Sequence, residues 1–193
     1  MRVFVITFLV LFYSCLAWAE LPNGNVTIAG DISISSDTQT MTINQQSDQA
    51  IIEWNSFNIG ENNTVTFQQP SSSASALNRV ISGNPTTLAG SLNANGKVFV
   101  VNENGVYFTP TSTINAHSFA ASTLALSNDD FLNNKFLFKA DNVNNIFSSI
   151  IHKGSITTLD GGFTALLGGA IDNEGTINAN LGKIGIGAGK EIT

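Results

Sequence analysis

Paired carboxylates and histidines are the residues of this chain that could take part in acid–base or metal chemistry. Asp129 and Asp130 are adjacent, and His117 and His152 are the two histidines of the sequence. Neighbouring residues of a strand point to opposite faces, so the two aspartates cannot easily reach one bond or one ion. Neither histidine has a carboxylate at a spacing that would indicate a metal ligand or a general base. We therefore interpret Asp129 and Asp130 as a turn or a helix cap, and we predict no catalytic or metal-binding role for any of the four.

Two further side chains could bind a substrate or a partner. Arg79 is the only arginine after residue 19; it could pair with a partner, but a structural salt bridge is the simpler interpretation. Trp54 could form a platform for a carbohydrate, but we favour a role in the core or in a cap of the fold. The sequence contains no nucleophile elbow, phosphate loop or zinc-ligand spacing. These patterns predict a protein that is not an enzyme and that holds no metal or cofactor.

The charge balance limits the partners that the chain can bind. Only 11% of its 193 residues are charged, against roughly 25% in an average soluble domain. Removal of residues 1–19 would leave seven basic and fourteen acidic side chains, a net charge of −7. An acidic surface of this kind disfavours nucleic acid and anionic membranes as ligands. The abundant neutral polar side chains can instead stack in ladders along a repeated fold.

The N-terminal segment, residues 1–19, is predicted to be a signal peptide. Arg2 supplies the positive charge, residues 3–12 form the apolar stretch, and residues 17–19 (Ala-Trp-Ala) match a cleavage site. The apolar stretch is shorter than the roughly 20 residues that a membrane-spanning helix needs. Cys15, the single cysteine, lies inside this segment, so the exported chain would have no disulfide or thiol chemistry. We expect export from the cytoplasm and one domain over residues 20–193.

A near-repeat dominates the C-terminal part, where residues 154–156 (Gly-Ser-Ile) return as residues 175–177 (Gly-Thr-Ile). Short strands punctuated by glycine at such a period are typical of stacked solenoid rungs, which bury their inward side chains against their neighbours. The stripes of period 3.6 that a helical solenoid needs are not evident. We predict an all-β fold, a right-handed parallel β-helix with rungs of about 21 residues. At this offset the sequence also aligns Gly161 with Gly182, Phe163 with Ile184, Ala165 with Ile186, Gly168 with Gly189 and, more loosely, Val98 with Phe119 and Val100 with Ala121.

Two motifs mark candidate corners and recognition sites of this solenoid. Residues 98–108 contain two strand-forming runs around Asn102-Glu103-Asn104-Gly105. Locally the pattern favours a hairpin, but in a coiling parallel sheet a corner between two strands is the better interpretation. Asn102 and Asn104 could make this corner through local side-chain hydrogen bonds, contact a partner, or do both. The same alternatives hold for Asn84-Pro85, because the residue before a proline is extended and makes a loop by itself.

The remaining segments predict the ends of the fold and one excursion from it. Alternating apolar residues between positions 26 and 43 predict an N-terminal β cap, and a turn of helix is expected after residues 128–130, with an aspartate as its cap. Residues 135–152 alternate less regularly and predict a small hairpin outside the rungs, which resume at His152. After Ile184 the sequence lacks the polar cap that a terminal repeat needs. We therefore expect an N-terminal piece of a longer solenoid.

A set of motifs occurs in one order along the chain: WNSFNIG at 54–60, NRV at 78–80 with GNP at 83–85, LNANG at 92–96, VFVVNENG at 98–105, ASTL at 121–124, NDDF at 128–131 and the rungs from Gly154. The ordered set resembles the N-terminal secretion domain of two-partner secretion exoproteins of the filamentous haemagglutinin and haemolysin type. The resemblance covers essentially all of residues 20–193. One position departs from it, because Glu103 stands where the family commonly has proline, which would fix φ and remove a donor.

The resemblance implies a function. Such domains are exported to the periplasm, recognised there by a TpsB-type outer-membrane barrel with periplasmic recognition domains, and guide a β-helical exoprotein whose folding they nucleate at the cell surface. The exoprotein would be a secreted or surface-held adhesin or haemolysin that could reach host cells through downstream regions. We expect the domain to be a monomer. The alternatives are a β-helical polysaccharide lyase or hydrolase, which needs clustered acids beside a basic residue, and a short self-standing surface adhesin, since one fold serves many functions.

Overall fold

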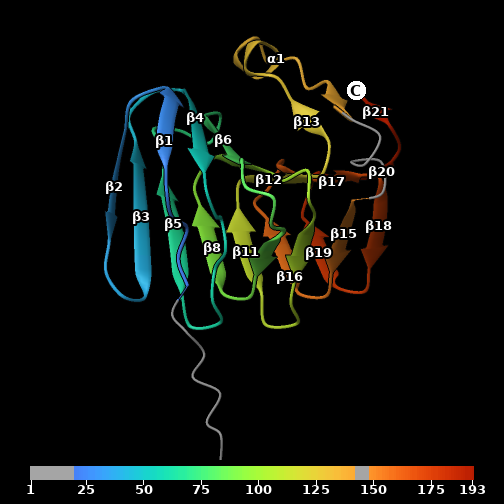
Figure 1. Cartoon of the computed structure of the whole chain (residues 1–193), viewed down its shortest axis with the longest axis horizontal. Coiled ribbons are helices and arrows are strands. Elements are labelled where there is room, and N and C mark those ends of the chain that lie inside the picture. The colour runs from blue at the N-terminus through green and yellow to red at the C-terminus, as the bar shows by residue number, and fades with distance from the viewer. Residues whose placement is uncertain (1–19, 142–147) are drawn as a thin grey trace, which may run out of the picture.

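The computed structural model describes residues 20–141 and 148–193. The predicted signal peptide, Cys15 and residues 142–147 lie outside the described residues. Figure 1 shows short strands stacked side by side along the long axis of the molecule, from β2 and β3 at one end to β18 and β20 at the other. Successive turns of the chain therefore lie next to one another, as a solenoid requires.

The chain coils around three sheets, and each complete turn adds one strand to each sheet. The first sheet contains, in spatial order, β1 (Val26–Ala29), β4 (Gln49–Trp54), β6 (Ser75–Val80), β9 (Lys97–Val101), β12 (Ser118–Ser122), β17 (Phe163–Gly168) and β20 (Lys183–Ala188). The second sheet contains β7 (Thr86–Leu88), β10 (Val106–Phe108), β15 (Ser149–His152) and β18 (Ala170–Asn173). The third sheet contains β2 (Ile32–Ser36), β3 (Thr40–Gln45), β5 (Thr64–Gln68), β8 (Ser91–Ala94), β11 (Thr113–Ala116), β16 (Ser155–Thr158) and β19 (Thr176–Ala179).

Neighbouring strands of these sheets pair in parallel except at the N-terminal end. There β1 pairs antiparallel with β4, and β2 pairs antiparallel with β3. The antiparallel strands cover the first turn, because they return along its edge instead of continuing the coil. The predicted parallel β-helix with an N-terminal β cap is therefore confirmed. The interpretation of residues 102–105 as a corner is confirmed too, since β9 and β10 lie in different sheets.

The predicted period holds in part of the solenoid only. Val98 pairs with Phe119 and Ile156 pairs with Ile177, as predicted. Near the N-terminus the turns are longer, and Gln49 pairs with Ser75, 26 positions further on.

In the last turn the predicted register is wrong by one residue, because β17 and β20 pair at an offset of 20. Phe163 lies beside Lys183, and Thr164 lies beside Ile184. The cause is the turn before each strand: four residues separate β16 from β17, whereas three separate β19 from β20. The predicted equivalences of Phe163, Ala165 and Gly168 with Ile184, Ile186 and Gly189 therefore fail, and Gly161 and Gly182 lie in turns of unequal length. Because strand side chains alternate, a slip of one residue exchanges the inward and outward faces.

Inward side chains fill a continuous apolar core. Trp54 is fully buried there, edge-on to the ring of Phe57 at a centroid distance of 5.4 Å. Its Nε1 donates to Asn78 Oδ1 at 3.1 Å, and Asn78 Nδ2 donates to the carbonyl of Phe99 at 3.2 Å. These bonds link three consecutive strands of the first sheet, so the expected core role of Trp54 is confirmed.

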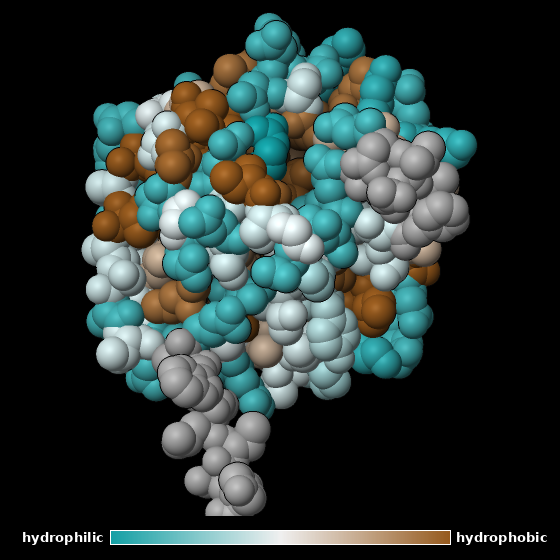
Figure 2. Space-filling view, viewed as in Figure 1, coloured by the Kyte–Doolittle hydropathy of each residue, from teal (hydrophilic) through white to brown (hydrophobic). Residues whose placement is uncertain are grey.

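The third sheet presents a neutral polar face to solvent. Figure 2 shows the surface over this sheet mostly in teal and pale colours. Asn115 Nδ2 donates to Asn93 Oδ1 on the neighbouring strand at 3.4 Å. Charged side chains stacked in the same way would repel one another. The register aligns one outward residue from each of six strands: Thr42, Thr66, Asn93, Asn115, Thr157 and Asn178.

An excursion leaves the solenoid after β12 and returns at β15. It contains β13 (Ala125–Leu126), α1 (Asn128–Leu132) and β14 (Phe138–Lys139), and β14 also pairs with β21 (Glu191–Ile192). The predicted hairpin is present as the antiparallel pair of β13 and β14, but β13 precedes the expected segment and the rungs resume at Ser149 instead of His152. Within the described ranges the structure contains no helix with the length and apolar character needed to span a bilayer.

The cap of α1 differs from the prediction. The N-cap is Ser127, whose Oγ accepts from Asp130 N at 3.1 Å and donates to a carboxylate oxygen of Asp130 at 2.8 Å. An aspartate therefore contributes to the cap from within the first turn instead of forming it. Serine is among the preferred N-cap residues for this reason.

Candidate recognition site at the Asn102 corner

The Asn102 corner, made of residues 81–85 and 102–105, joins the first sheet to the second on two successive turns. Residues 81–85 connect β6 to β7, and residues 102–105 connect β9 to β10. Thr86 N donates to the carbonyl of Gly105 at 3.0 Å, so the two connections stack. The structure thus brings all six candidate residues to one corner of the solenoid: Asn84, Pro85, Asn102, Glu103, Asn104 and Gly105.

Asn102 is the buried centre of this corner, with 0% of its surface exposed. Its Nδ2 donates to the carbonyl of Asn84 at 3.0 Å and to Thr86 Oγ1 at 2.9 Å. Its Oδ1 accepts from Asn104 N at 2.9 Å, and its own backbone N donates to the carbonyl of Ser122 at 2.9 Å. Asn102 therefore ties its own turn to the turn before it and to the turn after it.

Asn104 and Gly105 shape the outer edge of the corner. Gly105 has a φ of +125°, in the region that favours glycine. The exposed Asn104 donates from Nδ2 to the carbonyl of Ser82 at 2.8 Å. These are the local hydrogen bonds and the turn geometry that the motif predicts, and Glu103 does not prevent them.

Burial divides the six candidates into two groups. Asn102 and Gly105 are buried, Glu103 is half-buried, and Asn84, Pro85 and Asn104 are exposed. A cavity of about 220 Å³ lies where Pro85 meets Asn104 and Gly105. A partner can therefore reach the exposed amides and the proline ring, while the buried pair holds them in place. Contact with a partner stays a prediction for all six.

Sequence reasoning missed a second polar group beside this corner. Asn58 Oδ1 accepts from Thr87 N at 2.7 Å, and its Nδ2 donates to Glu20 Oε1 at 2.7 Å. A cavity of about 260 Å³ lies between Glu20, Asn58, Asn84 and Pro85. Ile59 pairs with Leu88 of the next turn, so Asn58 stands opposite Thr87, directly after the Asn84-Pro85 connection. The sequence hides this neighbourhood because the N-terminal turns are longer than those that follow.

Arg79 holds the excursion against the solenoid. Its Nη1 lies 3.2 Å from Glu53 Oε1, and its Nη2 donates to the carbonyl of Leu126 at 2.7 Å. Both Arg79 and Glu53 are half-buried. The expected structural salt bridge is confirmed, and the second bond gives the guanidinium a role that a point charge could not fill.

Two of the residues first considered for chemistry, His152 and Asp130, have structural hydrogen-bond partners. His152 is fully buried, its Nδ1 lies 2.6 Å from Asn173 Oδ1, and burial lowers the pKa of the imidazole. The hydrogen bond from Ser127, helped by Lys135 at 3.3 Å, lowers the pKa of the Asp130 carboxyl. In residues 20–141 and 148–193 no group of three or more His, Cys, Asp or Glu side chains could hold a metal ion.

The fold and the corner together define a β-solenoid with exposed amides and a proline ring at one corner. The chain belongs to the TPS secretion domain family, whose model matches residues 20–192. It is therefore the secretion domain of a two-partner secretion exoprotein. This family is a family of secretion domains and not of enzymes, so the polysaccharide-lyase alternative is not supported.

Relatives agree with this assignment. The chain is 37% identical over 180 residues to a heme/hemopexin-binding protein of Haemophilus influenzae (strain ATCC 51907 / DSM 11121 / KW20 / Rd), matching 90% of this chain and 20% of that protein. It is 41% identical over 120 residues to another heme/hemopexin-binding protein of Haemophilus influenzae, matching 62% of this chain and 13% of that one. The crystal structure of the HMW1 secretion domain from Haemophilus influenzae superposes with a TM-score of 0.84 at 35% identity, over 89% of this chain and 46% of that one. The chain thus spans about a fifth or less of the curated relatives it matches.

Proposed function

We propose that a TpsB-type outer-membrane transporter recognises this domain in the periplasm through the Asn102 corner. The observation that supports this most directly is the pairing of exposed Asn84, Pro85 and Asn104 with the buried, multiply bonded Asn102. Binding sites benefit when exposed groups are fixed in advance by a rigid scaffold. The periplasmic recognition domains of the transporter would meet amides already held in one arrangement.

The domain would also nucleate folding of the exoprotein at the cell surface. At roughly 0.05–0.15 kcal/mol per residue, a turn of about 21 residues contributes about 1–3 kcal/mol on folding. Each turn that folds on the outside therefore opposes return of the chain through the barrel. Export through the periplasm, with the product secreted or held at the outer surface, follows from this order of events.

The cargo that we propose is a heme- or hemopexin-binding exoprotein, because both curated relatives are heme/hemopexin-binding proteins. The cargo activity would belong to sequence beyond the secretion domain, since the match covers 20% of the first relative and 13% of the second. An adhesin or haemolysin cargo, and a self-standing surface adhesin, are the alternatives. Soluble heme or hemopexin binding by the product of the complete reading frame, but not by residues 20–193, is the expected result.

A secretion assay tests the recognition site. The exoprotein is co-expressed with its transporter, and secreted and periplasmic fractions are quantified for the double variant Pro85→Ala/Asn104→Ala. We expect secretion to fall by at least tenfold while the far-UV spectrum and the urea midpoint of the domain stay close to those of the native chain. Asn115→Ala, which removes an exposed amide from the third sheet, is the matched control and should secrete normally.

Two outcomes would contradict the proposal. Unchanged secretion of the double variant would remove the corner from the recognition site. Normal secretion of an exoprotein that lacks residues 20–193 would remove the entire domain from the export step.

A further inference from the structure

Three asparagines of this chain are each followed by glycine: Asn23-Gly24, Asn95-Gly96 and Asn104-Gly105. An asparagine before a glycine is the peptide step that deamidates most readily, because the missing Cβ leaves the glycine nitrogen open to approach by the asparagine side chain. The local chemistry is the same at all three steps. Any difference in their reactivity must therefore come from the tertiary structure.

The step at Asn95 is held closed by the neighbouring turn. Asn95 Oδ1 accepts from Gln69 N at 2.7 Å, and Asn95 Nδ2 donates to the carbonyl of Gln69 at 2.7 Å. Gly96 is buried. The Asn95 amide cannot turn toward Gly96 N without breaking both hydrogen bonds.

The step at Asn104 is held by the corner itself. Asn104 Nδ2 donates to the carbonyl of Ser82 at 2.8 Å, and Gly105 N donates to the carbonyl of Asn102 at 3.1 Å. Gly105 is buried, although Asn104 is exposed. Both the attacking nitrogen and the side chain that it would attack are therefore engaged elsewhere.

The step at Asn23 has neither form of protection. Asn23 and Gly24 are both exposed. Within the part of the chain that the structure describes, neither the Asn23 side chain nor Gly24 N has a hydrogen-bond partner. Gly24 has a φ of +66°, and a Cβ on it would overlap the side-chain amide of Asn55. The fold thus requires glycine at the position that makes Asn23 reactive.

The backbone around Asn23 favours the first chemical step as well. The carbonyl oxygen of Asn23 accepts from Asn55 N at 3.1 Å and from Ser56 N at 3.3 Å. Loss of the proton from Gly24 N would place negative charge on this peptide group, much of it on that oxygen. Donors directed at an atom where charge develops stabilise the charged form. The two donors therefore make the N–H of Gly24 a better acid.

We propose that Asn23 is a site of spontaneous covalent modification, deamidating through a succinimide while Asn95 and Asn104 are protected. Gly24 N loses its proton and attacks Cγ of Asn23, forming the new C–N bond of the ring, while Nδ2 takes up a proton and leaves as ammonia. Water then opens the ring, giving aspartate when it adds at Cγ and isoaspartate when it adds at the main-chain carbonyl. The overall reaction consumes one water, releases one ammonia and involves no oxidation or reduction.

The two products change different features of the molecule. Aspartate adds a negative charge to the cleft of about 260 Å³ that Asn23 lines together with Glu20 and Asn58. Isoaspartate carries the main chain through the former side chain and lengthens it by one methylene. This displaces the carbonyl of residue 23 from its two donors and breaks the bridge between Asn23 and Ser56. Isoaspartate therefore loosens the N-terminal segment from the first turn.

Peptide mapping by mass spectrometry tests the proposal on the purified full chain, incubated in mildly alkaline buffer with and without urea. In urea the three steps should deamidate at similar rates. In the folded chain Asn23 should stay within a few-fold of its unfolded rate. Asn95 and Asn104 should react at least roughly tenfold more slowly than when unfolded, because two hydrogen bonds must break before attack.

Two variants separate the reaction from its protection. Asn23→Gln should fold like the native chain, because the Asn23 side chain makes no hydrogen bond, and should show no deamidation at this position, since the longer side chain closes a less favourable ring. Asn102→Ala removes the acceptor of Asn104 N. It should raise the rate at Asn104 several-fold in the folded chain and leave the rate at Asn23 unchanged.

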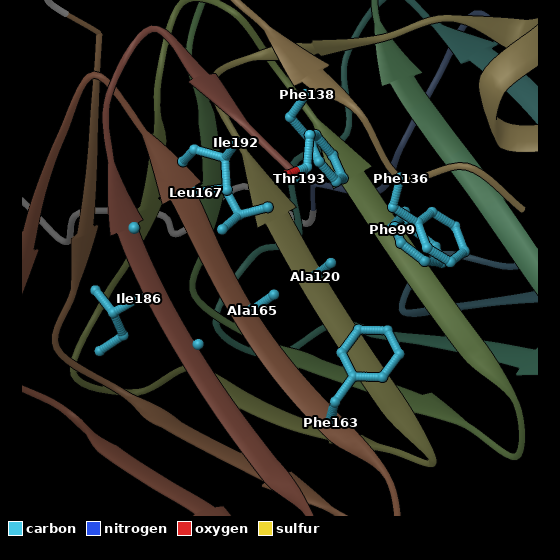
Figure 3. Close-up of a pocket in the computed structure, with 12 residues that line it drawn as sticks. Phe99, Ala120, Phe136, Phe138, Phe163, Ala165, Leu167, Ile186, Ile192 and Thr193 are labelled. Carbon is cyan, nitrogen blue, oxygen red and sulfur yellow. The ribbon is translucent and has the colours of Figure 1, made fainter.

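Hydrogen exchange measures the structural effect of the modification. After incubation, the amides of Asn55 and Ser56 should exchange faster in the isoaspartate fraction than in the native chain, because they have lost their acceptor. The control strand is β17, near the other end of the first sheet, where Figure 3 shows Phe163, Ala165 and Leu167. Its amides should exchange at the native rate.

Three results would overturn the proposal. The first is an Asn23 that stays unmodified in the folded chain while it reacts in urea. The second is an equal rate at all three steps in the folded chain, and the third is a faster rate at Asn95 or Asn104 than at Asn23. Because these measurements contain no transporter, their failure would leave the secretion role of the domain untouched.

Discussion

Replacement of Asn102 by alanine should separate the architecture of the corner from recognition of a partner. The substitution removes both donors of Nδ2, which reach the carbonyl of Asn84 and Thr86 Oγ1, and the acceptor of Asn104 N. Thr86 is 1% exposed, so its hydroxyl has no easy access to water. A buried polar group left unpaired costs about 1–3 kcal/mol, and groups at an exposed edge cost less because water replaces the partner.

We expect Asn102→Ala to lower the free energy of unfolding by about 2–4 kcal/mol, a large share of the roughly 5–15 kcal/mol of a typical domain. Equilibrium unfolding in urea measures this as a lower midpoint at an unchanged slope. Asn102→Asp should be at least as destabilising as Asn102→Ala, because it loses both donors and places a buried carboxylate against the carbonyl oxygen of Asn84. Asn104→Ala, at an exposed site, should cost about 0–1 kcal/mol.

The secretion assay then completes the argument. If Asn104→Ala lowers secretion while its stability stays native, the exposed amide acts in recognition. If Asn102→Ala lowers secretion in proportion to its loss of stability, the buried amide acts through the fold. A change below about 0.5 kcal/mol in Asn102→Ala, within the range of an ordinary surface substitution, would refute the account of this corner as a buried hydrogen-bonded centre.

Three further predictions concern packing, pH and the excursion. Gly162→Ala should lower the free energy of unfolding by about 2 kcal/mol or more, seen as a lower urea midpoint, because its Cβ would overlap the carbonyl of His117. A Cβ on Gly185 would meet no heavy atom within 4 Å, so Gly185→Ala should change the free energy of unfolding by less than about 1 kcal/mol. Burial lowers the pKa of His152 in the folded chain below the ordinary value of 6.5, so the unfolded chain binds the proton more readily. The free energy of unfolding should therefore fall as the pH drops below 6.5. A His152→Gln variant whose free energy of unfolding falls equally between pH 7.5 and 5 would contradict this. Ser127→Ala removes the N-cap of α1 and should cost about 0.5–2 kcal/mol, detected as faster proteolysis within the excursion than in the native chain.

Much of the fold could be predicted because the residue types of short segments determine where strands and corners form. Alternating β-branched and aromatic residues favour strands, and glycine and asparagine favour the corners between them. The pairing of Ile156 with Ile177 follows directly from the sequence repeat. The register of β20 does not follow, because it depends on a turn shortened by one residue, and a sequence comparison at fixed offset cannot detect where the missing residue lies.

The candidate site was predictable in its residues but not in its roles. Asn102 and Asn104 look equivalent in the sequence, yet one is fully buried and the other is exposed. The difference arises because Asn102 faces Asn84 and Thr86, which lie 18 and 16 positions away along the chain. Asn58 and Glu20, which border the same corner, were missed for the same reason, since only the stacking of unequal turns places them there.

By itself the sequence determined the solenoid class, the family and the location of the corner, because strand alternation, glycine punctuation and ordered motifs are properties of neighbouring residues. Only the tertiary structure decided which amides are buried and that Arg79 joins Glu53 to the carbonyl of Leu126. Those features depend on contacts between turns and with the excursion. Burial and charge at such contacts are set by residues tens of positions apart, whose distance in space is fixed only when the chain has coiled.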